Sequence, residues 1–405
     1  MKRNKIISIF FFSIFFSSIL FTACNNGNND KSKGKDTSAI DSSKLKPKFV
    51  LPKGDRQYDD LARLMAGLKA EEGSKFAALQ ETPKLKTHEH SFDTLWSKSE
   101  VIKYSDKMKD WRKAELGDDK NDTTTLFYPF SGPDFLNAFT FFPYAKKYIM
   151  LALEPAGTIP DFSKVPADTF SGYFNMLKNS LNSILNLSFF QTIAMSHDFK
   201  NQVINGTIPV LFTFIVRTGN KINDVKPVMI DSTGAIVPAE FVAVVKNISK
   251  NYGVQIDFKN PDNDYLQTVY YFSCDLSNDG FSKDKGLGIY LNNLGKVKVY
   301  LKAASCLMFH DFFSQIRDIM IAHTDLLLED DSGIPYKYFD KKIWDIKLYG
   351  DYVRPIPLFA DDYQKDLRQA YINDSASIKK LDFGIGYNYV KGKSNMMVAK
   401  KKAAK

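Results

Sequence analysis

The pattern of apolar and polar positions divides the chain into helical and extended segments. Apolar residues recur at helical spacing between residues 57 and 116, for example in the run from Tyr58 to Ala66, and this spacing predicts helices. A further helix is predicted over 171–200. Continuous apolar runs bounded by turn residues predict strands at 148–153, 208–216 and 226–230.

Two stretches of the sequence repeat the same order of elements. A strand-like run from Leu126 is followed by a short aromatic helix over 135–142 and by the strand at 148–153, which ends at Glu154. Later, a strand over 297–301 precedes a helix over 309–322 and a strand over 325–328, which ends at an acidic run. Each stretch therefore predicts a β-α-β unit.

The remaining alternating segments, at 252–258, 266–274 and 287–291, predict antiparallel strands. Together these elements predict the α+β class: a mixed, largely antiparallel sheet with packed helices and two pseudo-repeated β-α-β halves, 49–245 and 246–390. The predicted folded region, 49–390, is long enough to bury a large core in one large domain or two closely packed domains.

The N-terminus has the layout of an export signal. Lys2, Arg3 and Lys5 precede an apolar run over 6–21, which is too short to span a bilayer as a helix, and small residues lead to Cys24. This segment resembles a bacterial lipoprotein signal, although Phe21 stands where such signals usually carry leucine. The resemblance implies cleavage after residue 23 and a diacylglycerol on Cys24; the alternative is an ordinary cleaved signal and a free thiol.

The residues after Cys24 refine this expectation. Asn25 stands where an aspartate would imply retention at the inner membrane, so the resemblance implies a lipid anchor in the outer membrane. Residues 24–48 are rich in Asn, Lys, Ser and Asp, which predicts a flexible tether. Which face of the membrane the folded region occupies stays open.

The positive charge of the chain is concentrated at its ends. Of the formal net charge of +9, the signal carries three charges, and residues 391–405 contain six lysines and no acid. We therefore predict a basic C-terminal tail over 391–405 and no nucleic-acid partner. Cys274 and Cys306 either pair in an oxidising compartment or, as we expect, are buried thiols.

The string from Tyr128 to Asp134 is the sharpest local motif. Its Pro-Phe-Ser-Gly-Pro segment predicts a tight turn between a strand and a helix, with Ser131 or Asp134 capping the helix. Ser131 and Asp134 are accordingly the candidate ligand-binding residues, because a helix start offers unpaired N–H groups. The alternative interpretation is a cap and turn without a ligand.

Four carboxylates are the candidate catalytic residues: Asp134, Glu154, Asp330 and Asp331. Glu154 and the acidic run 329–331 end equivalent strands of the two β-α-β units. If the units pack about a pseudo-twofold axis, their carboxylates converge, and such a pair serves as acid and base on a glycosidic bond. The alternative is that these acids lie in solvent-exposed turns.

No motif for a cofactor or a metal is present, so the sequence predicts neither. Tyr128–Asp134, Asp330–Tyr338 and Gly384–Tyr387 together resemble uncharacterised exported proteins of the Bacteroidetes kind, a resemblance that implies no activity. We expect an outer-membrane lipoprotein whose periplasmic or surface domain binds an envelope ligand or protein. The alternative is an envelope hydrolase, acting on glycan, that uses paired carboxylates.

Overall fold

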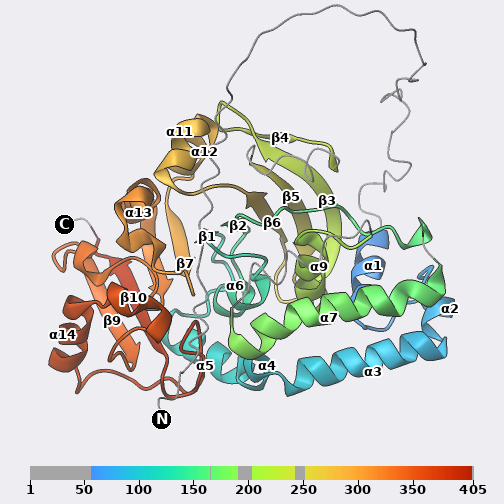
Figure 1. The fold of residues 1–405 in the computed structure, drawn as a ribbon, viewed down its shortest axis with the longest axis horizontal. Helices are drawn as coiled ribbons and strands as arrows, with labels where there is room; N and C mark the ends of the chain where they lie inside the picture. The colour runs from blue at the N-terminus through green and yellow to red at the C-terminus, as the bar shows by residue number, and fades with distance from the viewer. Residues whose placement is uncertain (1–55, 165, 190–202, 242–250, 404–405) are drawn as a thin grey trace, which may run out of the picture. The chain divides into compact units, whose positions relative to one another are not determined.

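A computed structural model describes residues 56–164, 166–189, 203–241 and 251–403. The predicted signal peptide, Cys24 and the predicted tether lie outside the described residues, as does the end of the helix predicted over 171–200. The described chain is built around one ten-stranded sheet with helices on both faces (Figure 1). None of its described helices is both long enough and apolar enough to span a membrane.

The strands, in chain order, are β1 (Thr125–Pro129), β2 (Lys147–Ala152), β3 (Lys221–Ile230), β4 (Ile236–Pro238), β5 (Tyr252–Lys259), β6 (Leu266–Ser273), β7 (Val297–Leu301), β8 (Thr324–Glu329), β9 (Trp344–Gly350) and β10 (Asn395–Lys401). Their order in the sheet is β4-β3-β5-β6-β2-β1-β7-β8-β10-β9. The five central strands, from β6 to β8, are parallel to one another. The flanking pairs are antiparallel. The predicted α+β class with a mixed sheet is confirmed.

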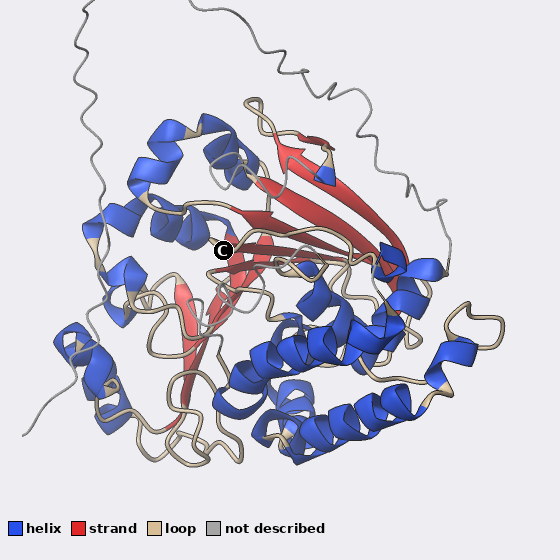
Figure 2. Ribbon diagram, turned by 45° about the vertical axis from the view of Figure 1, so that its right-hand side comes forward, coloured by secondary structure: helices blue, strands red, loops and turns tan. Residues whose placement is uncertain are grey.

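The helices are α1 (Gln57–Met65), α2 (Ala77–Gln80), α3 (Pro83–Lys98), α4 (Glu100–Lys103), α5 (Ser105–Glu115), α6 (Phe135–Phe141), α7 (Phe170–Leu187), α9 (Ile208–Arg217), α11 (Asn278–Lys283), α12 (Lys285–Asn292), α13 (Ser314–His323) and α14 (Lys365–Asn373). They divide into two layers (Figures 1 and 2). Helices α1, α3 to α7 and α9 bury their apolar residues in a core on one face of the sheet. Helices α11 to α14 do so on the other face.

Both predicted β-α-β units are present at the centre of the sheet. β1, α6 and β2 form the first, and β7, α13 and β8 form the second, with β1 paired to β7 between them. From β1 and from β7 the chain therefore continues in opposite directions across the sheet. Because such crossovers are almost always right-handed, α6 and α13 are expected on opposite faces, where their side chains are found. A duplication of the two units stays a prediction.

The predicted boundary between the halves does not divide the core. β6, from the second half, lies between β5 and β2, so one sheet runs through both halves. The chain from Leu51 to Lys405 accordingly forms a single compact unit. The two cores are separated by the sheet rather than by a point in the sequence, because every central strand buries side chains on both faces.

Two segments predicted as strands are helices. Residues 208–216 belong to α9, which begins at Ile208 with Pro209 in its first turn and is buried on every side. Residues 287–291 belong to α12, where the side chain of Asp284 caps the first turn by accepting from the N–H of Gly286. The first prediction failed because a continuous apolar run fits a fully buried helix as well as a strand. The second failed because five residues are too few to separate the alternation of a strand from the spacing of a half-buried helix, in which Ile289 is exposed.

The predicted basic tail is wrong over its central part. Residues 395–401 form β10, which lies between β8 and β9 and pairs with both. The side chains from Asn395 to Ala399 are buried, whereas Lys400 is exposed. Within this lysine-rich stretch, the short apolar segment Met396–Ala399 is long enough to form the buried part of a strand.

Candidate functional site

At the centre of the sheet, between β1 and β7, the direction in which successive strands are added to the sheet reverses. β1 and β7 are parallel neighbours, and the chain leaves the carboxyl end of β1 toward one face and that of β7 toward the other. In open sheets of this kind, ligands bind in the crevice outside the carboxyl ends of such strands. We call the residues gathered there, Tyr128–Asp134, Tyr300–Cys306 and Asp330, the switch-point site.

The connection after β1 brings Asp134 to the start of α6. Phe130 and Gly132 have φ angles of 57° and 52°, so the backbone turns sharply between Pro129 and Pro133. Asp134 then caps the helix: its Oδ1 accepts from the backbone N–H of Asn137 at 3.2 Å and from Asn137 Nδ2 at 3.0 Å. The turn and cap predicted for this motif are confirmed.

A buried ion pair joins this connection to β7. Lys302 Nζ lies 2.6 Å from Asp134 Oδ2, and the two side chains are only 2% and 1% exposed. The hydroxyl of Tyr128 donates to the same carboxylate oxygen at 2.9 Å, and Lys302 also donates to the carbonyl of Ser188, just after α7. Burying two charges is costly, and this cost is offset by the hydrogen bonds that each ion makes besides the pair itself.

The connection after β7 is strained. Six described non-glycine residues have a positive φ, and five lie at this site or in contact with it: Phe130, Ser188, Ala303, Ser305 and Cys306. Each such residue costs of the order of 1 kcal/mol or more, and this kind of strain gathers at functional sites.

Hydrogen bonds from Asp330 hold the strained connection after β7. Asp330 Oδ2 accepts from the N–H of Ala303 at 2.9 Å, and Asp330 Oδ1 accepts from the N–H and hydroxyl of Ser332. Asp330, placed directly after β8, is therefore part of the switch-point site.

Three hydroxyl groups, two at the site and one on Ser188 beside it, are buried without a hydrogen-bond partner in the described protein: those of Ser131, Ser188 and Tyr300. Buried polar groups are almost always bonded, so each exception needs an explanation. The ring of Tyr300 packs on that of Tyr128 with 4.6 Å between centroids, which fixes the position of its hydroxyl. Two of the three, Ser131 and Tyr300, lie on β1 or β7 or immediately after them.

The two carboxylates of the site raise the pKa of the same two tyrosines. Burial, with the charges of Asp134 and Asp330, raises the pKa of Tyr128 and of Tyr300 well above the ordinary value. Burial also raises the pKa of Asp330, an effect that the nearby Lys302 ammonium opposes. Asp134 and Asp330 are thus the two candidate carboxylates that the fold brings together.

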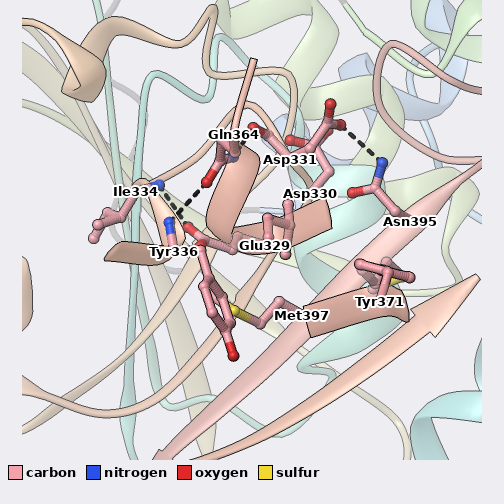
Figure 3. Close-up of a pocket in the computed structure, with 11 residues that line it drawn as sticks. Glu329, Asp330, Asp331, Ile334, Tyr336, Gln364, Tyr371, Asn395 and Met397 are labelled. Carbon is pink, nitrogen blue, oxygen red and sulfur yellow. Dashed lines mark hydrogen bonds between the residues drawn. The ribbon is translucent and has the colours of Figure 1, made fainter. Parts of the chain in front are cut away.

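The other two predicted carboxylates lie elsewhere. Asp331 lies just beyond β8 in a small pocket lined by Glu329, Asp330, Gln364 and Tyr371, where Asn395 Nδ2 donates to Asp331 at 2.9 Å (Figure 3). Glu154, at the end of β2, is buried beside Tyr271, whose hydroxyl donates to the Glu154 carbonyl. The predicted convergence of Glu154 with the acidic run is not seen.

Burial also perturbs the acids of this pocket. It raises the pKa of Glu329 well above the ordinary value, although the carboxylate accepts from the N–H of Ile334 (Figure 3). Burial and then the charge of Asp330 raise the pKa of Asp331 to about 7. The folded state therefore favours the protonated form of the Asp331 carboxyl group up to about neutral pH.

Among the described residues no group of three or more His, Cys, Asp or Glu side chains is arranged to hold a metal ion. Cys274 and Cys306 are both buried free thiols, which confirms the expectation for this pair. Lys302 and Tyr300 were missed by sequence reasoning. The available signal was a lysine directly after the apolar strand 297–301, a place where an unpaired charge would be buried.

Comparison with known proteins adds no family to this geometry: the sequence matches no protein family model and no curated protein.

Breaking the buried pair is expected to be far more damaging than breaking an exposed one. Lys302→Met should lower the free energy of unfolding by about 3–5 kcal/mol, because Asp134 keeps a buried charge without its partner. In the double variant with Asp134→Asn the loss should be clearly smaller than the sum of the single losses. Urea unfolding of the full chain measures all three.

Lys298→Met is the matched control for this cycle. Lys298 is at the other end of β7, and its ion pair with Asp122 is partly exposed, so its loss should cost no more than about 1 kcal/mol. Equal costs for Lys302→Met and Lys298→Met would show that the buried pair has no special role.

The raised pKa of Asp331 predicts that stability falls as pH rises. The folded state holds the proton more tightly than the unfolded state, so the contribution is complete below about pH 4 and is lost between about pH 4 and 7. Asp331→Asn should flatten this part of the profile and raise stability at pH 8 by on the order of 2 kcal/mol. Exposed Asp374→Asn is the control; parallel profiles for the two variants would contradict the assignment.

Proposed function

We propose that this chain is an envelope lipoprotein, anchored in the outer membrane through a diacylglycerol on Cys24, whose folded region binds an uncharged, hydroxyl-bearing ligand at the switch-point site. The observation that carries the binding proposal is the set of buried hydroxyl groups without partners, Ser131 and Tyr300 above all. The anchor rests on the basic, apolar and small residues that precede Cys24.

The charges of the site favour an uncharged ligand. Asp134 is already neutralised by Lys302, and Asp330 is bonded to backbone and hydroxyl donors. A charged ligand would bring an unmatched charge into a buried environment. Hydroxyl groups of the ligand can instead donate to and accept from Tyr300 and Ser131, and neutral sugars of envelope glycans have this chemistry.

A loop packs directly on the site and must move for a ligand to enter. The Tyr387 hydroxyl lies 2.7 Å from Ser305 Oγ and donates to the carbonyl of Ala303 at 3.1 Å. Gly386, with a φ of 62°, lies so close to Asp330 that a Cβ atom would be 1.9 Å from Oδ2. Only glycine fits this approach. Ligand entry has to break the two hydrogen bonds of the Tyr387 hydroxyl and displace its ring from those of Phe189 and Phe359.

Hydrolysis of a glycosidic bond is the second candidate function. Asp330 is buried, and burial raises its pKa, which is the direction that a general acid requires. Asp134 would then be the second carboxylate of the pair, since it acts on the same two tyrosines. Glu154 and Asp331, which lie outside the site, have no role in this scheme.

Tyr300→Phe tests the binding proposal. Its hydroxyl has no partner in the protein, so its removal should not lower the free energy of unfolding, yet affinity for the ligand should fall about tenfold. Calorimetric titration of the full chain with a panel of neutral mono- and oligosaccharides measures the affinity. The control is Tyr148→Phe, which loses a hydrogen bond to the Phe142 carbonyl at 2.7 Å and should cost stability but leave affinity unchanged.

Two outcomes separate the candidates. A binder leaves the oligosaccharides intact, whereas a hydrolase releases new reducing ends and loses this activity in Asp330→Asn. Absence of binding to any neutral sugar, or an affinity that Tyr300→Phe leaves unchanged, contradicts the proposal that an uncharged ligand binds beside Tyr300.

Cys24→Ala tests the anchor. Without the thiol no diacylglycerol can be attached, so the protein should move from the detergent phase to the aqueous phase in phase partitioning of cell envelopes. Ser17→Ala, within the apolar run of the signal, should leave partitioning unchanged. A Cys24→Ala protein that stays in the detergent phase would exclude lipidation as the basis of membrane association.

A further inference from the structure

A second cavity lies at the opposite edge of the sheet, at the amino ends of the central strands. Its volume is about 260 Å³, and it is lined by the end of α5 and the loop after it, by the segment between α6 and β2, and by Lys298 of β7 and Leu326 of β8. No residue of the switch-point site lines it. The volume corresponds to roughly nine water molecules of the liquid, or a ligand of about a dozen non-hydrogen atoms.

One wall of the cavity is apolar and aromatic. Phe141, Phe142 and Tyr144 contribute to it, with Leu116 and Leu326. The carbonyl groups of residues 143–145 already accept hydrogen bonds from the protein. Gln267 Nε2 donates to the carbonyls of Pro143 and Ala145, and the Tyr265 hydroxyl donates to that of Tyr144. This wall therefore offers surface for an apolar group and few free acceptors.

The rest of the lining carries both signs of charge, and the Arg112 guanidinium lies over the Tyr144 ring, 5.8 Å from its centroid. Arg112 and Lys298 are the cations of the lining, and Asp119 and Asp122 are its carboxylates. Lys298 and Asp122 pair with each other, and Arg112 Nη1 bonds Asp118 and the Gly117 carbonyl. The charged groups that line the cavity sum to zero, so a ligand with a net charge would be unmatched there.

Two polar groups of this charged part of the lining are available to bond a ligand. Arg112 is 5% exposed, and its Nε–H is buried without a hydrogen-bond partner in the described protein. Asp119 Oδ1 accepts from the backbone N–H of Asn121 at 2.9 Å, which leaves Oδ2 to accept from a ligand. One free donor on a guanidinium and one free acceptor on a carboxylate match an anionic and a cationic group of the same small molecule.

We infer that this cavity binds a small zwitterion of the amino-acid type with an aromatic or branched aliphatic side chain. The ligand carboxylate accepts from Arg112 Nε, its ammonium donates to Asp119, and its side chain packs on the wall formed by Phe141, Phe142 and Tyr144. This site is separate from the switch-point site and does not depend on the function proposed for it.

Calorimetric titration of the full chain with L-phenylalanine and L-leucine tests the inference. Both should bind, whereas 3-phenylpropionate, which lacks the ammonium, and 2-phenylethylamine, which lacks the carboxylate, should each bind at least tenfold more weakly. Asp119→Asn should weaken L-phenylalanine binding at least tenfold while its amide oxygen keeps the bond to Asn121. Arg112→Lys, which keeps the charge but has no Nε–H, should have a similar effect.

Asp110→Asn is the matched control, because Asp110 is an exposed acid of α5 outside the cavity lining; it should leave binding unchanged. Failure of both amino acids to bind overturns the inference, as does an equal effect of Asp119→Asn and Asp110→Asn. Loss of L-phenylalanine binding in Tyr300→Phe would place the ligand at the switch-point site and would overturn it as well.

Discussion

The buried ion pair between Asp134 and Lys302 is the interaction on which the centre of this fold depends. One ammonium group ties the start of α6, the end of β7 and the carbonyl after α7 to a single point, and the Tyr128 hydroxyl adds β1 to it. An apolar pair could fill the same space, and often with greater stability. The charged pair instead favours one arrangement of these segments, because each ion needs its hydrogen-bond partners in place.

That pair also shows where sequence reasoning reaches its limit. The turn after β1 and the cap at Asp134 follow from Pro, Gly and Asp at local spacings, and they were predicted correctly. Lys302 was not predicted, because its partner is distant in the sequence and only the pairing of β1 with β7 brings them together. Local chemistry was readable from the chain, whereas the contacts between segments required the sheet order.

The acidic run after β8 illustrates the same limit. Glu329, Asp330 and Asp331 read as one cluster in the sequence. The Asp330 carboxylate accepts from the N–H of Ala303, and all three residues also line the small pocket beside Tyr371, where Asp331 accepts from Asn395. A single acidic motif thus contributes both to the switch-point site and to this pocket.

The position of β10 has a consequence for the order in which the sheet can form. The last strand of the sequence, Asn395–Lys401, lies between two strands that are synthesised before it. Until those residues have emerged, β8 and β9 have no partner to join them and the sheet stays open at this side. Formation of the complete sheet therefore waits until residues 395–401 have been synthesised, because β10 is the strand that joins β9 to β8.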